Sequence, residues 1–152
     1  FPTLLNTFPD ATFIVTHRDP VEVTLSMATM ISYASRMAND HPDPVAISRY
    51  WLDRAGDLLG GCLRDRDLLP AGQSIDVRFT DFMADEEGTI ARIYELAGQP
   101  LTAQARAAMT QFRTEHPRGR HGGVRYNAED LGLDADVVGR RLAVYRERFV
   151  TS

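Results

Sequence analysis

Apolar and β-branched residues are concentrated in two short runs, each bounded by turn-forming residues. Residues 11–16 (Ala-Thr-Phe-Ile-Val-Thr) follow a Pro-Asp pair and precede Arg18-Asp19-Pro20. Residues 74–79 (Ser-Ile-Asp-Val-Arg-Phe) alternate apolar and polar side chains after a Leu-Pro-Ala-Gly-Gln turn. The first run is typical of a buried parallel strand and the second of a half-buried one. We therefore predict two strands.

After the first predicted strand, apolar residues recur with the spacing of α-helices. Asp19 and Pro20 are typical of an N-cap and a first helical residue, with Glu22 at the capping-box position, so a helix is predicted to run to about residue 38. We expect one apolar face on this helix, made of Val23, Met27, Met30, Ile31, Ala34 and Met37. A second helix is predicted over residues 44–65, with a stripe made of Ile47, Trp51, Ala55, Leu58 and Cys62.

The rest of the chain predicts helices separated by one irregular segment. Helices are expected over residues 86–97 and from a Thr102 cap to Glu115. A short helix is expected from Asn127 and a final one from Asp134; the final helix is predicted to pack Val138, Leu142, Tyr145 and Phe149. Residues 116–126 hold three glycines, three arginines and two histidines without a helical period.

Strands alternating with helices predict an α/β domain with a parallel sheet. Two strands are too few for an independent sheet of this kind. The chain also begins at Phe1 rather than at a methionine. We therefore expect residues 1–152 to be the C-terminal part of a single domain, with the remaining strands in an N-terminal segment of the same protein.

Composition narrows the classes of function. All 17 basic residues are arginines, which excludes a Walker A lysine and Schiff-base chemistry. A net charge of −4 argues against nucleic acid as a partner. No apolar run is long enough to span a membrane. The single Cys62 excludes an internal disulfide and, with no visible signal peptide, favours the cytoplasm.

One strand-to-helix corner carries residues suited to an anion. Arg18 ends the first predicted strand, where open α/β sheets bind their ligands, and its planar guanidinium matches two phosphate oxygens. Ser26 lies about 9 Å further along the following helix, so both side chains can reach one phosphate. The alternative is that Arg18 pairs with a carboxylate and Ser26 is a solvated helix residue.

Residues 8–26 (Phe-Pro-Asp-Ala-Thr-Phe-Ile-Val-Thr-His-Arg-Asp-Pro-Val-Glu-Val-Thr-Leu-Ser) resemble the 3′-phosphate-binding motif of sulfotransferases that use 3′-phosphoadenosine 5′-phosphosulfate (PAPS). The similarity is strongest to bacterial members of that family. It continues in order through residues 51–53, 77–85, 93–98 and 118–133, and so spans nearly the whole chain. The resemblance implies a P-loop NTPase-like parallel sheet with flanking helices, of which this chain holds only the C-terminal part.

The resemblance also implies a donor site. Arg18 and Ser26 match the family's 3′-phosphate ligands in type and spacing. Phe79 stands where the family commonly has a tyrosine against the adenine; the alternative is a core strand residue. In the glycine-rich basic loop, Arg118, Arg120, His121 and Gly122 resemble further 3′-phosphate contacts, with histidine replacing the usual lysine; the alternative is a surface loop.

The implied reaction moves a sulfuryl group from PAPS to a hydroxyl or amine and leaves 3′-phosphoadenosine 5′-phosphate. The family's phosphosulfate loop and catalytic histidine precede the matched region, so no catalytic residue is assigned. The resemblance implies an acceptor that is a small molecule, a glycan or a lipid. An exposed sheet edge would favour pairing with a second copy.

Other chemistries fit less well. His17-Arg18-Asp19 lacks the asparagine that a kinase catalytic loop requires. The four histidines show no metal-ligand spacing, so no metal site is predicted. His17 itself is interpreted as a packed residue, with proton transfer as the alternative. A non-catalytic or degenerate nucleotide-binding or interaction domain is the rival to the enzyme, because the lysine-bearing loop is absent from this sequence.

Overall fold

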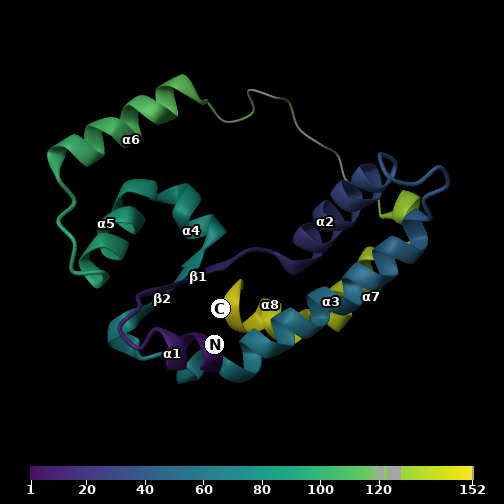
Figure 1. Cartoon of the computed structure of the whole chain (residues 1–152), viewed down its shortest axis with the longest axis horizontal. Helices are drawn as coiled ribbons and strands as arrows, with labels where there is room; N and C mark the ends of the chain where they lie inside the picture. Colours follow the sequence, from purple (N-terminus) through teal and green to yellow (C-terminus); the bar gives the residue numbers. More distant parts are fainter. Residues whose placement is uncertain (118, 120–121, 123–127, 152) are drawn as a thin grey trace.

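The computed structural model describes residues 1–117, 119, 122 and 128–151, and its centre is a short parallel sheet (Figure 1). Strand β1 (Phe13–His17) pairs with β2 (Ser74–Arg78), in register from Phe13 opposite Ser74 to His17 opposite Arg78. The two parallel strands of the sequence analysis are confirmed. The second predicted strand extended one residue too far, because Phe79 is the first residue of a helix.

Helices α2 (Pro20–Ser35) and α3 (Pro44–Asp65) connect the two strands and pack along each other (Figure 1). Asp19 caps α2 as predicted, since its carboxylate accepts hydrogen bonds from the backbone N–H groups of Val21 and Glu22 at 2.9 and 3.3 Å. Asp43 caps α3 in the same way.

The predicted apolar face of α2 is not its buried face. The buried side chains are small, and two of the four are polar, at i, i+4, i+8 and i+12: Pro20, Thr24, Ala28 and Ser32. Met30 and Met37 are 64% and 80% exposed. Thr24 donates to the carbonyl of Pro20, four residues back, so its hydroxyl is satisfied inside the interface. Small residues on this face allow close approach of α3.

The predicted stripe of α3 is partly right. Ala55 is buried at 7% exposure, but Leu58 is 70% exposed. The other buried positions are Ser48, Leu52 and Asp65. Ser48, like Thr24 on α2, donates to a carbonyl four residues earlier in its own helix.

The remaining helices lie on two sides of the strands (Figure 1). Helices α4 (Phe79–Ala84), α5 (Glu86–Leu96) and α6 (Ala103–Glu115) follow β2 on one side. Thr102 caps α6 as predicted, and Gly98 ends the α5 segment with a φ of 62°. The other short elements are α1 (Pro2–Thr7), η1 (Arg66–Leu68), η2 (Ala71–Gln73) and η3 (Glu129–Leu131).

The predicted final helix is two helices, α7 (Ala135–Arg141) and α8 (Ala143–Phe149), which meet at Leu142. Asp134 caps α7 as predicted. All four side chains predicted to pack are at most 6% exposed: Val138, Leu142, Tyr145 and Phe149. The main core joins α2, α3, η3 and α7 through Ala28, Leu52, Leu131, Leu133, Val138 and Leu142. The helix start predicted at Asn127 lies outside the described residues.

Candidate functional site

The corner between β1 and α2 presents Arg18 at the carboxyl end of the sheet. The strand ladder ends at His17 and Asp19 caps α2, so Arg18 lies between the last strand residue and the helix cap. Pro20 at the first helical position has no N–H to satisfy and its φ suits the helix start. Local sequence therefore fixes the backbone on both sides of Arg18.

The side chain of Arg18 lies between an acid and an aromatic ring. Its Nε and Nη2 donate to Glu22 Oε2 at 3.3 and 3.1 Å. Its guanidinium carbon lies 4.4 Å from the centre of the Phe79 ring. The Arg18 side chain is 48% exposed, so solvent still reaches the guanidinium. The structure thus pairs Arg18 with a carboxylate, as the alternative interpretation expected, and also brings it onto Phe79.

Phe79 reaches Arg18 because β2 is parallel to β1. Both strands end at the same edge, and Phe79 opens the helix that follows β2 as Arg18 leads into the helix that follows β1. Phe79 is 41% exposed and so is not a core strand residue. Among the predicted site residues that the structure describes, Arg18 and Phe79 are the pair shown in contact.

Ser26 is half-buried on α2, one turn beyond Glu22. Residues four apart share a helix face, so Glu22 lies between Arg18 and Ser26 along that face. Glu22 was predicted only as a capping residue. The i, i+4 spacing from Arg18 to Glu22 was the available signal for their ion pair.

The glycine-rich loop is described at only two of its positions. Gly119 and Gly122 have φ angles of 77° and 80°, in the left-handed region that glycine tolerates. The N–H of Gly122 donates to the carbonyl of Gly119 at 2.9 Å, which forms a tight turn. Arg118, Arg120 and His121 lie outside the described residues.

A pocket of about 550 Å³ opens beside this corner, on the face of the sheet that carries Ile14, Thr16 and Val77. Arg18 and Phe79 belong to its lining. The other walls are mainly apolar side chains of α2, α3, α4 and α5, including Val23, Met27, Leu58, Leu59, Phe82 and Ile93. The apolar residues Val23, Met27 and Leu58 of α2 and α3 therefore contribute to a cleft. Core packing was the simpler interpretation of the α2 methionines, and a helix face beside a substrate cleft, which has the same spacing, was its alternative.

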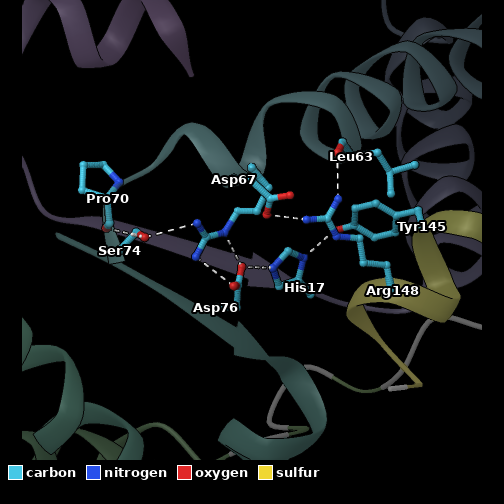
Figure 2. A network of polar contacts seen from close by, with 9 residues as sticks. His17, Leu63, Asp67, Pro70, Ser74, Asp76, Tyr145 and Arg148 are labelled. Carbon is cyan, nitrogen blue, oxygen red and sulfur yellow. Dashed lines mark hydrogen bonds and ion pairs between the residues drawn. The ribbon is translucent and has the colours of Figure 1, made fainter. Parts of the chain in front are cut away.

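On the opposite face of the sheet, polar side chains from β1, β2 and α8 form a hydrogen-bonded network (Figure 2). His17 bonds through Nδ1 to the Tyr145 hydroxyl and through Nε2 to Asp76 Oδ1, each at 2.7 Å. Arg66 donates from Nε and Nη2 to the two carboxylate oxygens of Asp76, both at 2.8 Å. The network was not predicted, although the interpretation of His17 as a packed residue agrees with its 2% exposure.

The network shifts the titration of its members. Burial by itself raises the pKa of Asp76, but hydrogen bonds from Arg66 and His17 outweigh burial and lower that pKa below its usual value. Burial raises the pKa of Tyr145 to about 12, so its hydroxyl stays protonated at neutral pH. Tyr145 is therefore a hydrogen-bond partner here and is not suited to act as a base.

The structure has parallel strands flanked by helices, and an arginine and an aromatic ring lie at the carboxyl edge of the sheet. These features define an α/β protein of the class that binds ligands at that edge. The chain belongs to the sulfotransferase family, whose family model matches residues 1–104. The P-loop-like fold implied by the resemblance is confirmed, because solved sulfotransferases superpose on the chain.

Two crystal structures illustrate this similarity. Sulfotransferase STF9 from Mycobacterium avium is 26% identical with a TM-score of 0.83, and the match covers 98% of this chain and 38% of that one. Sulfotransferase STF1 from Mycobacterium tuberculosis H37Rv is 26% identical with a TM-score of 0.70, covering 94% of this chain and 36% of that one. The chain thus spans less than half the length of either relative. No curated protein matches it.

Among the helices that the structure describes, none combines the length and the apolar character needed to cross a membrane.

Proposed function

We propose that this chain supplies the 3′-phosphate and adenine end of the donor site in a PAPS-dependent sulfotransferase. The observation that carries the proposal is the contact of Arg18 with Phe79 at the carboxyl edge of a parallel sheet. A guanidinium and an aromatic ring on adjoining strand ends suit a ligand that joins a phosphate to a purine base. Membership of the sulfotransferase family supports the choice of that ligand.

Each residue has a role set by its chemistry. Arg18 would bind phosphate oxygens through its planar fork, and Ser26 would donate its hydroxyl to the same group. Phe79 would pack against the adenine. In the glycine-rich loop, Arg118, Arg120, His121 and Gly122 would add further contacts to the anion through basic side chains and backbone N–H groups.

An anion that binds Arg18 has to compete with the carboxylate of Glu22. Its carboxylate occupies the Nε and Nη2 side of the guanidinium. An incoming phosphate would displace it or bind beside it, which is a small cost because exposed ion pairs contribute only about 0–1 kcal/mol.

The chain would act by positioning the donor. Sulfuryl transfer to a hydroxyl or amine, like phosphoryl transfer, depends mainly on alignment and on neutralising charge around the transferred group. Binding energy from the remote 3′-phosphate helps to orient the reacting end. That end would be bound by parts of the protein outside this chain, in one domain with residues 1–152; the 38% and 36% coverage of the two solved relatives supports this arrangement.

The test is calorimetry on the full-length polypeptide with two ligands, 3′-phosphoadenosine 5′-phosphate (PAP) and adenosine 5′-phosphate (AMP). Arg18→Gln is expected to weaken PAP binding by roughly 2–4 kcal/mol and AMP binding by much less, because only PAP carries the 3′-phosphate. Arg54→Gln is the matched control. Arg54 is 49% exposed, pairs with Asp57, and lies over Tyr50 at 5.5 Å, so it resembles Arg18 away from the site.

Two results would count against the proposal. An equal loss of affinity for PAP and AMP in Arg18→Gln would mean that Arg18 does not bind the 3′-phosphate. A wild-type protein that binds neither nucleotide would favour the non-catalytic or degenerate domain.

A further inference from the structure

The residue that precedes Arg18 is among the most completely enclosed side chains that the structure describes. The side chain of His17 is 0% exposed, whereas that of Arg18 is 48% exposed. Successive residues of a strand point to opposite faces, so the His17 ring points toward the network and the Arg18 side chain away from it. His17 and Tyr145 also form part of the wall of the pocket that Arg18 lines. Whatever fixes the His17 ring also fixes the backbone from which Arg18 projects.

Three contacts from two other elements hold the His17 ring. Tyr145 and Asp76 engage its two nitrogens at 2.7 Å each. The ring of Phe149 stacks on it with 4.5 Å between centres and 1° between planes. Tyr145 belongs to α8 and Asp76 to β2 (Figure 2), and Phe149 also belongs to α8. Strand β1 is therefore fixed at its last paired residue by both elements.

The partners of His17 are themselves held in place. Asp76 receives the two-point contact from Arg66, whose Nη1 also donates to Ser74 at 3.2 Å. Ser74 in turn donates to the carbonyl of Pro70 at 2.8 Å. The chain of contacts therefore runs back through β2 to the turn before it, and it leaves the His17 ring a single orientation.

We propose that His17 is a positioning residue for Arg18: the network formed by Asp76, Tyr145 and Phe149 sets the direction in which Arg18 leaves the sheet. This inference rests on the proposed function. A binding group must be held within about 0.5 Å of its productive position, and residues behind it supply that precision. In this proposal His17 acts through the backbone it shares with Arg18.

The experiment measures the ratio of PAP affinity to AMP affinity in full-length variants. His17→Phe keeps a flat ring against Phe149 and removes both hydrogen bonds, so the ratio is expected to fall about tenfold or more, the scale seen when a partner that orients a ligand-binding group is lost. In His17→Gln the side-chain amide can still donate to Asp76, and an intermediate ratio is expected. Leu52→Ala, in the main core, is the control for destabilisation: it is expected to lower the melting temperature and leave the ratio unchanged.

Tyr145→Phe provides a milder variant that keeps the α8 packing if His17→Phe fails to fold. It removes one hydroxyl, and a several-fold fall in the ratio is expected. An unchanged ratio in the folded His17 variants, or in Tyr145→Phe where those do not fold, would overturn the inference and leave His17 as a packing residue. A wild-type ratio near one would instead overturn the proposed function, and the positioning role with it.

Discussion

The guanidinium of Arg18 lies over the ring of Phe79, with 4.4 Å between the guanidinium carbon and the ring centre. The two residues are 61 positions apart in the sequence. They meet because each directly follows one of two paired parallel strands. A cation–π contact of this kind at a half-exposed site contributes about 0.5–1 kcal/mol, so its main effect is to hold both side chains ready for a ligand.

Phe79 is expected to contribute to adenine binding. Phe79→Leu should weaken PAP and AMP by a similar amount, roughly 1–3 kcal/mol, because the base is common to both and stacking on the ring is lost. Phe79→Tyr should keep binding, since it retains the aromatic ring and adds the hydroxyl that the family commonly has at this position. Calorimetry measures both, with Phe112→Leu as control: Phe112 is 61% exposed on α6 and also stacks on a neighbouring ring. Full PAP affinity in Phe79→Leu would contradict the assignment.

Glu22 is expected to oppose anion binding at Arg18. Glu22→Gln removes a negative charge that contacts the guanidinium, so PAP should bind about fivefold more tightly, equivalent to roughly 1 kcal/mol. The free energy of unfolding should change by less than about 1 kcal/mol, because the ion pair is exposed. Titration at low and high salt provides the check, since screening should reduce the gain. Weaker PAP binding in Glu22→Gln would show instead that the carboxylate orients Arg18.

The spacing of apolar residues predicted the positions of the helices correctly. It was less successful in predicting which face of each helix is buried. A hydrophobic stripe assumes that large apolar side chains enclose the core. In α2 the buried side chains are the small Thr24, Ala28 and Ser32, while the larger and more exposed Val23 and Met27 line the pocket. Hydrophobic spacing alone cannot distinguish a residue that faces a core from one that faces a cleft.

Helix caps were predicted correctly because they depend on interactions between residues that are close in the sequence. The caps at Asp19, Thr102 and Asp134 depend on hydrogen bonds within three residues, and all three formed as predicted. The His17 network could not be predicted in that way. Its partners Asp76 and Tyr145 are 59 and 128 positions away, so only the tertiary fold brings them together.

The carboxylate of Asp76 is expected to make stability depend on pH. Hydrogen bonds from Arg66 and His17 outweigh the effect of burial and lower its pKa in the folded state, so its charged form stabilises the fold above the unfolded-state pKa of about 4. This contribution is lost as the pH falls through the folded-state pKa. The difference in unfolding free energy between wild type and Asp76→Asn should therefore be constant from about pH 7 to pH 5 and shrink below about pH 4.

Chemical denaturation across that range measures the difference. Asp10→Asn, in an exposed turn, controls for the loss of one charge and should change stability little. A wild-type advantage that grew as the pH fell would show that the Asp76 carboxylate does not stabilise the fold.

Two glycines have nearly the same φ angle but different surroundings. Substituting each by alanine therefore distinguishes the cost of backbone strain from the cost of crowding. Gly98 and Gly132 have φ angles of 62° and 61°. A Cβ at Gly98 would meet nothing within 4 Å, whereas one at Gly132 would lie 2.8 Å from Val45 Cγ2. Gly98→Ala should cost roughly 1–2 kcal/mol for the left-handed conformation alone. Gly132→Ala should cost a further 1–3 kcal/mol or so, because the stiff side chain of Val45 must move. Urea denaturation of both variants gives the two values, and equal losses would mean that Val45 moves aside without cost.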